Sequence, residues 1–202
     1  ISIRSSSIMK QDNLEKFLNK VGRKVVSKSK ENLNRSKGST KLASTIKYKI
    51  VESGGSLDVA FSMADYGTFV DKGVKGKGGT IPNGKYKGSW NGRRHYITNE
   101  GKRKDSPYKF GSGRGRKGGL RKGIASFVRK KGLQPRTKGG KYASPKGLIY
   151  VISRNIYIRG IHGISFFQKA LGIGMKGYAE GVSKAIAKDI QADIEEQNKQ
   201  KK

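Results

Sequence analysis

The 202-residue chain has no cysteine, only two histidines and only 14 acidic residues. Without cysteine, neither a disulfide framework nor a thiolate metal site can form, and a reducing compartment is expected. So few acids and histidines leave little material for a carboxylate-bound metal or a nucleophile–base pair. The sequence therefore predicts that the chain is not an enzyme and that it binds no metal and no cofactor.

Long apolar runs are also missing. Only 33% of the residues are apolar, and no run approaches the roughly 20 apolar residues that span a bilayer. The sequence also has no signal-peptide core. We therefore expect a soluble protein without a membrane partner.

Positive charge and glycine are abundant. The chain has 45 lysines and arginines, a formal net charge of +31 and 29 glycines. Residues 72–147 hold 23 of these cations, opposed only by Glu100 and Asp105. Such a block repels itself in a free domain, so it predicts a polyanionic neighbour, with nucleic acid as the first choice.

Two roles for this basic block stay open at the level of sequence. Its cations could lie along phosphates, with glycines letting the backbone approach closely. Alternatively, the block could be an arm that becomes ordered on a protein neighbour, with Trp90 and Tyr96 as anchors. The candidate contacts to nucleic acid or a partner are Lys75, Lys77, Lys85, Lys87, Arg93, Arg94, Lys102, Arg103, Lys104, Arg114, Arg116, Lys117, Arg121, Arg129, Lys130 and Lys131.

Regular patterns occur mainly outside the block. Apolar residues at helical spacing predict a long helix over residues 8–34, with Asp12 and Glu15 near its start as a capping pair. Alternating residues over 45–51 and 56–63 predict a β-hairpin. Its two strands place Ile46, Tyr48 and Ile50 on the same face as Leu57, Val59, Phe61 and Met63.

Three further segments have a regular pattern. Residues 119–131 predict a helix that Gly132 ends, and the apolar run 148–152 fits either a strand or a buried helix. Residues 178–197 predict a C-terminal helix whose acids face solvent. The predicted fold class is α+β, with residues 1–71 and 148–202 as core. Residues 72–147 form an insertion in which only the 119–131 helix has its own fold.

Two stretches of the flanks resemble a known family. Residues 64–73 read Ala-Asp-Tyr-Gly-Thr-Phe-Val-Asp-Lys-Gly, which resembles the A-x-Y-A-x-x-V-E-x-G signature of the HK97 gene-10-like group. These are the head–tail joining or tail-completion proteins of tailed bacteriophages. Residues 148–171 include Ile152-Ser153-Arg154, Arg159-Gly160 and Phe166-Phe167, followed by Ala170-Leu171, and resemble a second stretch of that group. Gly67 and Asp71 depart from the first signature.

The resemblance implies a structural virion protein without a catalytic site, assembled in the host cytoplasm. Such a subunit forms a homo-oligomeric ring at the head–tail interface, with neck, tail and portal-complex proteins as partners. A phage neck surrounds genomic DNA, so the basic block would contact DNA or neighbouring subunits. The acidic C-terminal helix could meet the basic surface of an adjacent copy and so close a ring.

A second hypothesis does not need the family. The same charge would suit a nucleic-acid-binding protein, similar to a ribosomal or nucleoid protein, that acts directly on RNA or DNA. A nuclease is the third reading, weakened by the shortage of acids. A ring separates the first hypothesis from the second, because a monomer with tight, salt-sensitive RNA binding fits only the second.

Overall fold

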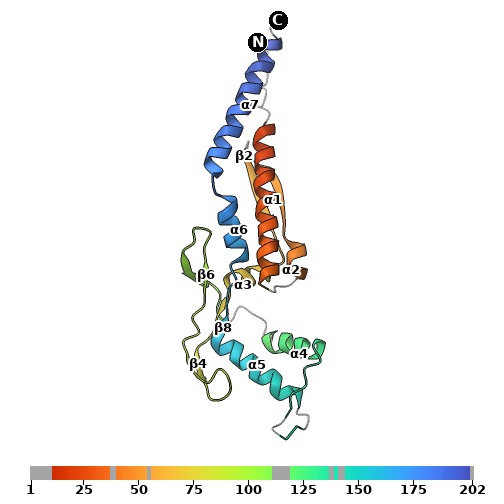
Figure 1. Ribbon diagram of the computed structural model, residues 1–202, viewed down its shortest axis with the longest axis vertical. Helices are drawn as coiled ribbons and strands as arrows, with labels where there is room; N and C mark the ends of the chain where they lie inside the picture. The colour runs from red at the N-terminus through yellow and green to blue at the C-terminus, as the bar shows by residue number, and fades with distance from the viewer. Residues whose placement is uncertain are drawn as a thin grey trace, which may run out of the picture. The chain divides into compact units, whose positions relative to one another are not determined.

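The computed structural model describes residues 11–36, 40–53, 56–110, 119–136, 139–140 and 144–200. The chain forms two compact units, each containing helices (Figure 1). Unit 1 comprises Ile1–Gly67, Thr98–Gly101 and Phe166–Lys202, and unit 2 comprises Thr68–Ile97 and Lys102–Ser165. Helices with small antiparallel sheets confirm the predicted α+β class.

The helices of unit 1 pack on its long N-terminal helix. This helix, α1, runs over Asp12–Arg35, followed by the short α2 (Thr40–Thr45); α6 (Phe166–Gly174) and α7 (Tyr178–Gln200) pack on α1. The apolar spacing of α1 buries Leu18, Val25 and Leu33, because these side chains share one helical face. The predicted helix is confirmed over its described residues; its expected start at 8–10 lies outside them.

The predicted hairpin is confirmed. Strands β1 (Lys47–Ser53) and β2 (Ser56–Ser62) pair antiparallel, with Tyr48 opposite Phe61 and Ile50 opposite Val59. The Tyr48 ring fills the space beside Gly22 of α1, and its hydroxyl donates a hydrogen bond to Asn19 Oδ1 at 3.1 Å. The face predicted by the alternating pattern therefore packs on α1.

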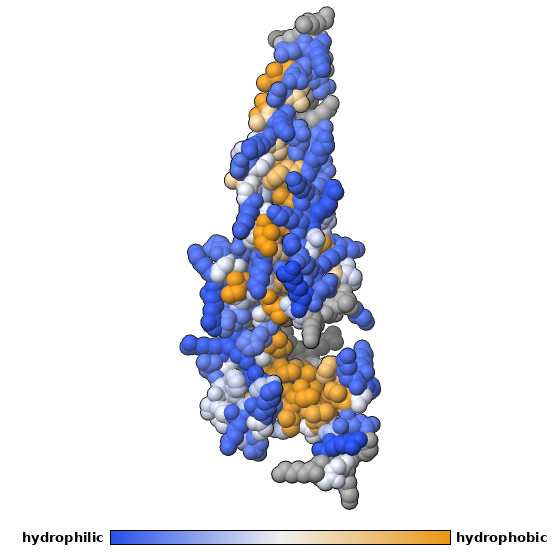
Figure 2. Space-filling view, viewed as in Figure 1, coloured by the Kyte–Doolittle hydropathy of each residue, from blue (hydrophilic) through white to orange (hydrophobic). Residues whose placement is uncertain are grey.

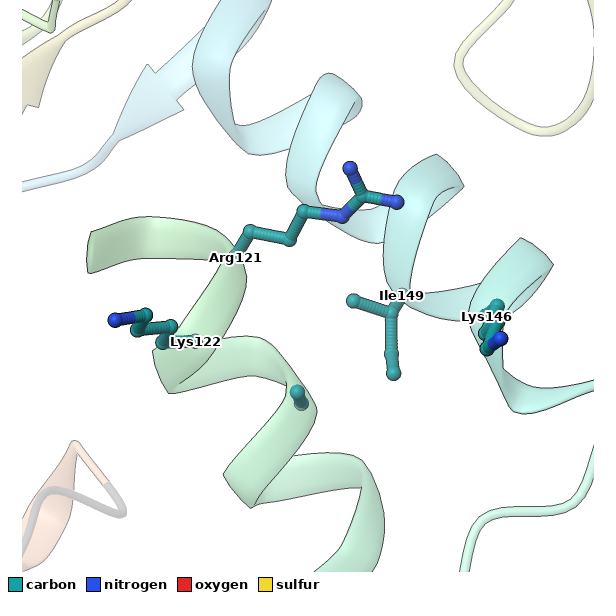
Figure 3. Close-up of a pocket in the computed structure, with 5 residues that line it drawn as sticks. Arg121, Lys122, Lys146 and Ile149 are labelled. Atoms are coloured by element: carbon teal, nitrogen blue, oxygen red, sulfur yellow. The ribbon is translucent and has the colours of Figure 1, made fainter. Parts of the chain in front are cut away.

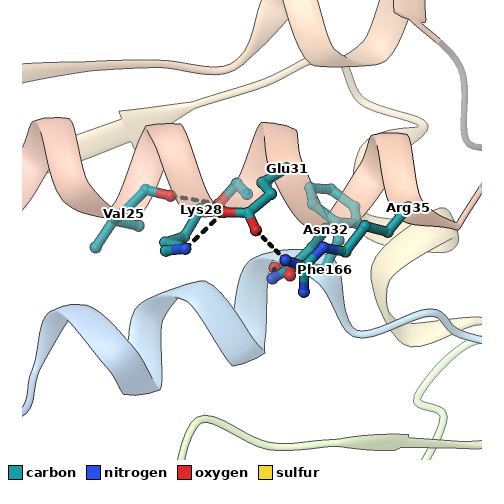
Figure 4. A network of polar contacts seen from close by, with 7 residues as sticks. Val25, Lys28, Glu31, Asn32, Arg35 and Phe166 are labelled. Atoms are coloured by element: carbon teal, nitrogen blue, oxygen red, sulfur yellow. Dashed lines mark hydrogen bonds and ion pairs between the residues drawn. The ribbon is translucent and has the colours of Figure 1, made fainter.

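A polar network joins α1 to α6 (Figure 4). Asn32 Nδ2 on α1 donates to the carbonyl of Phe166 at 3.0 Å, which holds the first residue of α6. Glu31 pairs with Lys28 and Arg35 on its own helix. The hydrogen bond from Lys28 lowers the pKa of Glu31. These ion pairs are exposed and stabilise little, whereas the Asn32 contact fixes where α6 begins.

The start of α1 differs from the predicted capping pair. The residue before the helix is Gln11, whose side chain makes no cap. Instead, both carboxylate oxygens of Asp189 on α7 accept hydrogen bonds, from the backbone N–H of Asn13 at 2.8 Å and of Leu14 at 3.0 Å. Asp189 is only 3% exposed, so the prediction that the acids of this helix face solvent is wrong for Asp189. Free N–H groups at a helix start attract a carboxylate, and here it comes from another helix.

Unit 2 contains most of the basic block and has more structure than the sequence predicted. After α3 (Gly67–Lys72) come the strands β3 (Val74–Lys75), β4 (Gly79–Ile81), β5 (Gly88–Trp90), β6 (His95–Ile97) and β7 (Arg103–Asp105). They form the two-stranded sheets β4–β5, β6–β7 and β3–β8, the last with β8 (Gly160–Ile161). The expectation that only residues 119–131 fold within the block is therefore wrong. Ladder hydrogen bonds stabilise strands too short to show an alternating pattern.

Two helices complete unit 2. The predicted helix is confirmed as α4 (Gly119–Lys130), and the ambiguous apolar run lies in α5 (Pro145–Arg159). The Ser144 hydroxyl caps α5 by accepting from Lys146 N, and Gly160 ends it with φ near +80°. Because α5 packs on α4 and β8 pairs with β3, residues 148–165 group with unit 2. The predicted domain boundary at 147 placed them with the core of unit 1.

Candidate nucleic-acid and partner interface

Two segments far apart in sequence meet at the β3–β8 pair of unit 2. Val74 lies opposite Ile161, and Lys75 lies opposite Gly160. Just beyond the pair, Ile164 N donates to the carbonyl of Val70 at 3.1 Å, and Ser165 N donates to that of Asp71 at 2.9 Å. We call residues 70–76 with 158–165 the strand junction. It brings together parts of the two stretches that carry the family resemblance.

Glycines make the strand junction possible. Gly73 has φ +72° and Gly160 has φ +80°, conformations that side-chain-bearing residues rarely adopt. A Cβ on Gly160 would collide with the carbonyl oxygen of Val74, and one on Gly163 would lie 2.6 Å from the carbonyl oxygen of Asp71. The two backbones therefore approach more closely than any other residue type allows.

Two buried hydroxyls tie neighbouring loops to the strand junction. Ser106 Oγ donates to the carbonyl of Gly73 at 2.8 Å, and Ser106 is fully buried. Ser165 Oγ accepts from the backbone N–H of Ile97 on β6 at 2.8 Å. The β6–β7 hairpin is thus fixed to the strand junction through polar contacts.

Arg159, at the end of α5, packs on two aromatic rings. Its guanidinium carbon lies 3.6 Å from the centroid of Tyr86 and 4.6 Å from that of Trp90. Trp90 Nε1 donates to the carbonyl of Tyr86 at 2.9 Å, which fixes the indole ring. We call these three residues the arginine stack. A guanidinium on aromatic faces is stabilised without a carboxylate.

A buried arginine, Arg94, lies near the arginine stack. Arg94 is 7% exposed, and its Nη1 donates to the carbonyl of Arg93 at 2.8 Å. Burial, and then the charge of Arg159, lowers the pKa of Arg94. The Nε atoms of Arg94 and Arg159 are buried without a hydrogen-bond partner in the part of the chain that the structure describes.

Two histidines lie on the same unit. The rings of His95 and His162 are 6.5 Å apart, and Arg103 Nη2 lies 2.9 Å from His95 Nδ1. His162 is exposed as a residue, yet desolvation of its ring lowers its pKa, and the charges of Arg94, His95 and Arg159 lower it further. His162 is therefore mainly neutral at pH 7 and adds little to the positive charge.

The predicted contact residues fall into three groups. Most are exposed and face solvent from several elements of unit 2, namely Lys77, Lys85, Lys87, Arg93, Lys102, Arg103, Lys104, Arg121, Arg129, Lys130 and Lys131. Lys75 is half-buried in β3, and Arg94 is buried. Arg114, Arg116 and Lys117 lie outside the described residues.

The two predicted anchor aromatics, Trp90 and Tyr96, are covered by other side chains of unit 2. Tyr96 is only 8% exposed, and the Lys72 ammonium lies 5.7 Å from its ring centroid. It belongs to the interior of unit 2, so it is not placed as an exposed anchor. Trp90 is half-buried against Arg159. Their spacing among glycines and lysines suggested exposure, but long-range contacts cover both rings.

A hydrophobic groove lies along the contact between α4 and α5. It consists of two adjoining pockets of about 300 and 340 Å³ that share Ala125 and Ile149. Figure 3 shows Ile149 on α5 directed toward α4, with Arg121 extending from α4. The cations that line the groove are Arg121, Lys122, Arg129 and Lys146. We call this feature the α4–α5 groove.

Exposed apolar side chains surround the groove. Phe127 on α4 is 47% exposed, and Tyr150 and Val151 on α5 are 49% and 53% exposed. Figure 2 shows a broad hydrophobic area over these two helices. An apolar area with a basic border is typical of a surface that binds a partner.

Sequence reasoning missed Tyr86, Arg159 and Asp189. Asp189 follows the apolar Val182 by seven residues and Ile186 by three, and this helical spacing was a usable signal that it lies on the packed side of α7. No local pattern links Arg159 with Tyr86, because the two residues meet only through the folding of unit 2.

No protein-family model, curated protein or solved structure matches the chain. Within the described ranges, no helix is long and apolar enough to cross a membrane. The same residues contain no group of three or more histidine or acidic side chains that could hold a metal ion.

Proposed function

We propose that the chain is a structural subunit of a tailed-phage virion, part of the neck or connector that joins tail to capsid. Several copies form a closed ring, and neck, tail or portal-complex proteins bind to it. The observation that carries this proposal is the strand junction. Parts of the two sequence stretches that resemble the joining-protein group meet there, and Gly73 and Gly160 fit that meeting.

The charge of unit 2 fits a position next to DNA. Unit 2 has 25 lysines and arginines against two aspartates. Exposed cations lie on several of its elements, among them β7, α4, α5 and the β4–β5 connection. In a ring, this charge is multiplied by the number of copies, and duplex DNA or acidic subunits would neutralise it.

Native mass spectrometry and electron microscopy of the full chain test the ring. We expect one closed oligomer of fixed stoichiometry, with or without added duplex DNA. Binding of labelled duplex DNA, measured by fluorescence anisotropy at several salt concentrations, should weaken steeply as salt rises. A strictly monomeric chain at high micromolar concentration would contradict the proposal.

A second candidate is a nucleic-acid-binding protein that acts as a monomer on RNA or DNA. The observation in its favour is the spread of exposed cations over both β7 and α4. It predicts tight, salt-sensitive binding of RNA or DNA by a monomer. The same two measurements therefore separate the two candidates.

A further inference from the structure

The C-terminal part of α7 has an exposed apolar pair. Ile190 and Ile194 are 46% and 54% exposed, and their spacing of four places them on one side of the helix. Earlier residues of the same stripe, Val182 and Ile186, are half-buried instead. The stripe drifts off the α1-facing side because four residues exceed one helical turn of 3.6.

This apolar pair lies among negative charges. Asp193, Glu195 and Glu196 fall in the interval between Lys188 and Lys199, which contains no lysine or arginine. The neutral amides of Gln197 and Gln191 donate to Asp193 and Glu195. These bonds leave the negative charges in place. We call residues 190–196 the acidic tail segment.

The α4–α5 groove has the opposite character. Its floor is apolar, with Val128 only 3% exposed, and four cations line it. The sequence has no acidic residue between Asp105 and Glu180, so nothing within that stretch neutralises those cations. The groove therefore favours an apolar helix that carries acids.

We propose that the acidic tail segment of one copy docks in the α4–α5 groove of a second copy. Ile190 and Ile194 are about 6 Å apart along the helix axis, and each enters one of the two adjoining pockets. Asp193 and Glu195 then meet the cations of the groove. The match of charge and apolar surface within one sequence is the reason to choose a second copy as the occupant.

Such a contact is head-to-tail, because it joins two different surfaces. Each copy has one tail segment and one groove, so association continues from copy to copy, and a rotation between copies that closes on itself gives a ring. This inference rests on the ring of the proposed function and gives that ring its interface. The contact needs no DNA, although DNA would reduce repulsion between the copies.

Two variants of the full chain test the interface. The tail variant carries Ile190→Ser with Ile194→Ser, and the groove variant carries Ala125→Glu. A control variant changes two other exposed apolar residues of unit 1, Ile173→Ser with Met175→Ser, which are 36% and 44% exposed. Circular dichroism and thermal melting should show the native fold in all three.

Sedimentation velocity gives the result that decides the question. We expect the wild type and the control to form the same oligomer, and the tail and groove variants to associate about 100-fold more weakly or worse. An equimolar mixture of the two variants should form a 1:1 dimer and nothing larger. The intact tail of the groove variant fills the intact groove of the tail variant, and the remaining surfaces are both changed.

The other outcomes overturn the proposal in distinguishable ways. If the variants assemble like the wild type, or the mixture stays monomeric while the wild type forms a ring, the interface is wrong and the ring survives. If the wild type is a monomer that binds nucleic acid, both the interface and the proposed function fail. If the tail variant melts earlier without any change in association, the tail segment packs within its own chain and the docking contact is excluded.

Discussion

The two units divide the charge of the chain unequally. Unit 1 has 20 lysines and arginines against 12 acidic residues, whereas unit 2 has 25 against two. Unit 1 buries large apolar side chains completely, among them Leu18, Leu42 and Phe166. Its acids also take structural roles, as when Asp189 caps α1. Unit 1 is thus a conventional folded unit.

Unit 2 has different stabilising contacts. Its backbone segments meet at glycines, its arginines pack on aromatic rings, and its strands are only two or three residues long. With so few acids, its cations have little opposite charge nearby. The contrast predicts that an added polyanion would stabilise unit 2 more than unit 1.

The largest expected effect is on the core of unit 1. Phe166 is fully buried, so Phe166→Ala should lower the free energy of unfolding by about 3–5 kcal/mol. The matched control is Phe127→Ala in unit 2, where the ring is 47% exposed and the expected loss is below about 1 kcal/mol. Urea unfolding followed by circular dichroism measures both. Equal losses of unfolding free energy in the two variants would show that the buried core of unit 1 contributes no more than the exposed surface of unit 2.

The next effect is on the strand junction of unit 2. Gly160→Ala forces a Cβ against the carbonyl of Val74 at φ +80° and should cost about 2–3 kcal/mol. Gly140→Ala is the control, because Gly140 has φ +79° and open space around its Cα; backbone strain alone costs about 1–2 kcal/mol. Hydrogen exchange of the Ile164 and Ser165 amides, which donate to the carbonyls of Val70 and Asp71, reports on the strand junction. Equal exchange in both variants would show that close approach is unimportant there.

The success of sequence reasoning follows the same division. In unit 1, α1 and the β1–β2 hairpin were predictable, because helical spacing of Leu18 and Val25 and alternation through Tyr48 and Ile50 are local signals. The α4 helix of unit 2 was predictable for the same reason. In these segments local pattern and tertiary packing agree.

The missed features depend on contacts distant in sequence. Strands β4 to β7 are three residues each, too short for alternation to show. Asp189 meets Asn13 across 176 positions of sequence, and the arginine stack joins the Tyr86–Trp90 segment to the distant Arg159. The apolar run that begins at Leu148 fitted either a strand or a helix. Ser144 as N-cap and Pro145 as the first helical residue favour the helix, and packing on α4 stabilises it.

A third prediction concerns the pH dependence of stability that Asp189 gives to unit 1. Burial raises the pKa of Asp189, but the hydrogen bonds from Asn13 and Leu14, together with the charge of Lys16, outweigh it and lower the pKa overall. The unfolded chain therefore binds the proton first. The stabilisation is present above the unfolded pKa of about 3.9 and is lost as the pH falls through the lower folded pKa.

Two variants test this assignment. Asp189→Ala should cost about 1–2 kcal/mol at pH 7, as loss of a helix cap does, and should reduce the fall in stability between pH 5 and pH 3. Glu180→Ala is the control, because Glu180 is exposed and accepts a hydrogen bond from Lys184 on its own helix. Thermal melts at each pH measure both. An unchanged pH profile in the Asp189 variant would show that another acid dominates unit 1.

The smallest effect concerns the arginine stack. Arg159→Lys keeps the charge of unit 2 but removes the planar group that covers Tyr86 and Trp90, so it should cost about 0.5–1 kcal/mol. Trp90 is the only tryptophan of the chain, so its fluorescence reports this contact directly. We expect emission to shift to longer wavelength and acrylamide quenching to increase. Arg154→Lys, whose arginine donates to the Tyr150 hydroxyl, should leave the emission unchanged. If the two variants give the same spectrum, arginine stacking does not order the basic unit, and the contrast with unit 1 then rests on its glycine contacts alone.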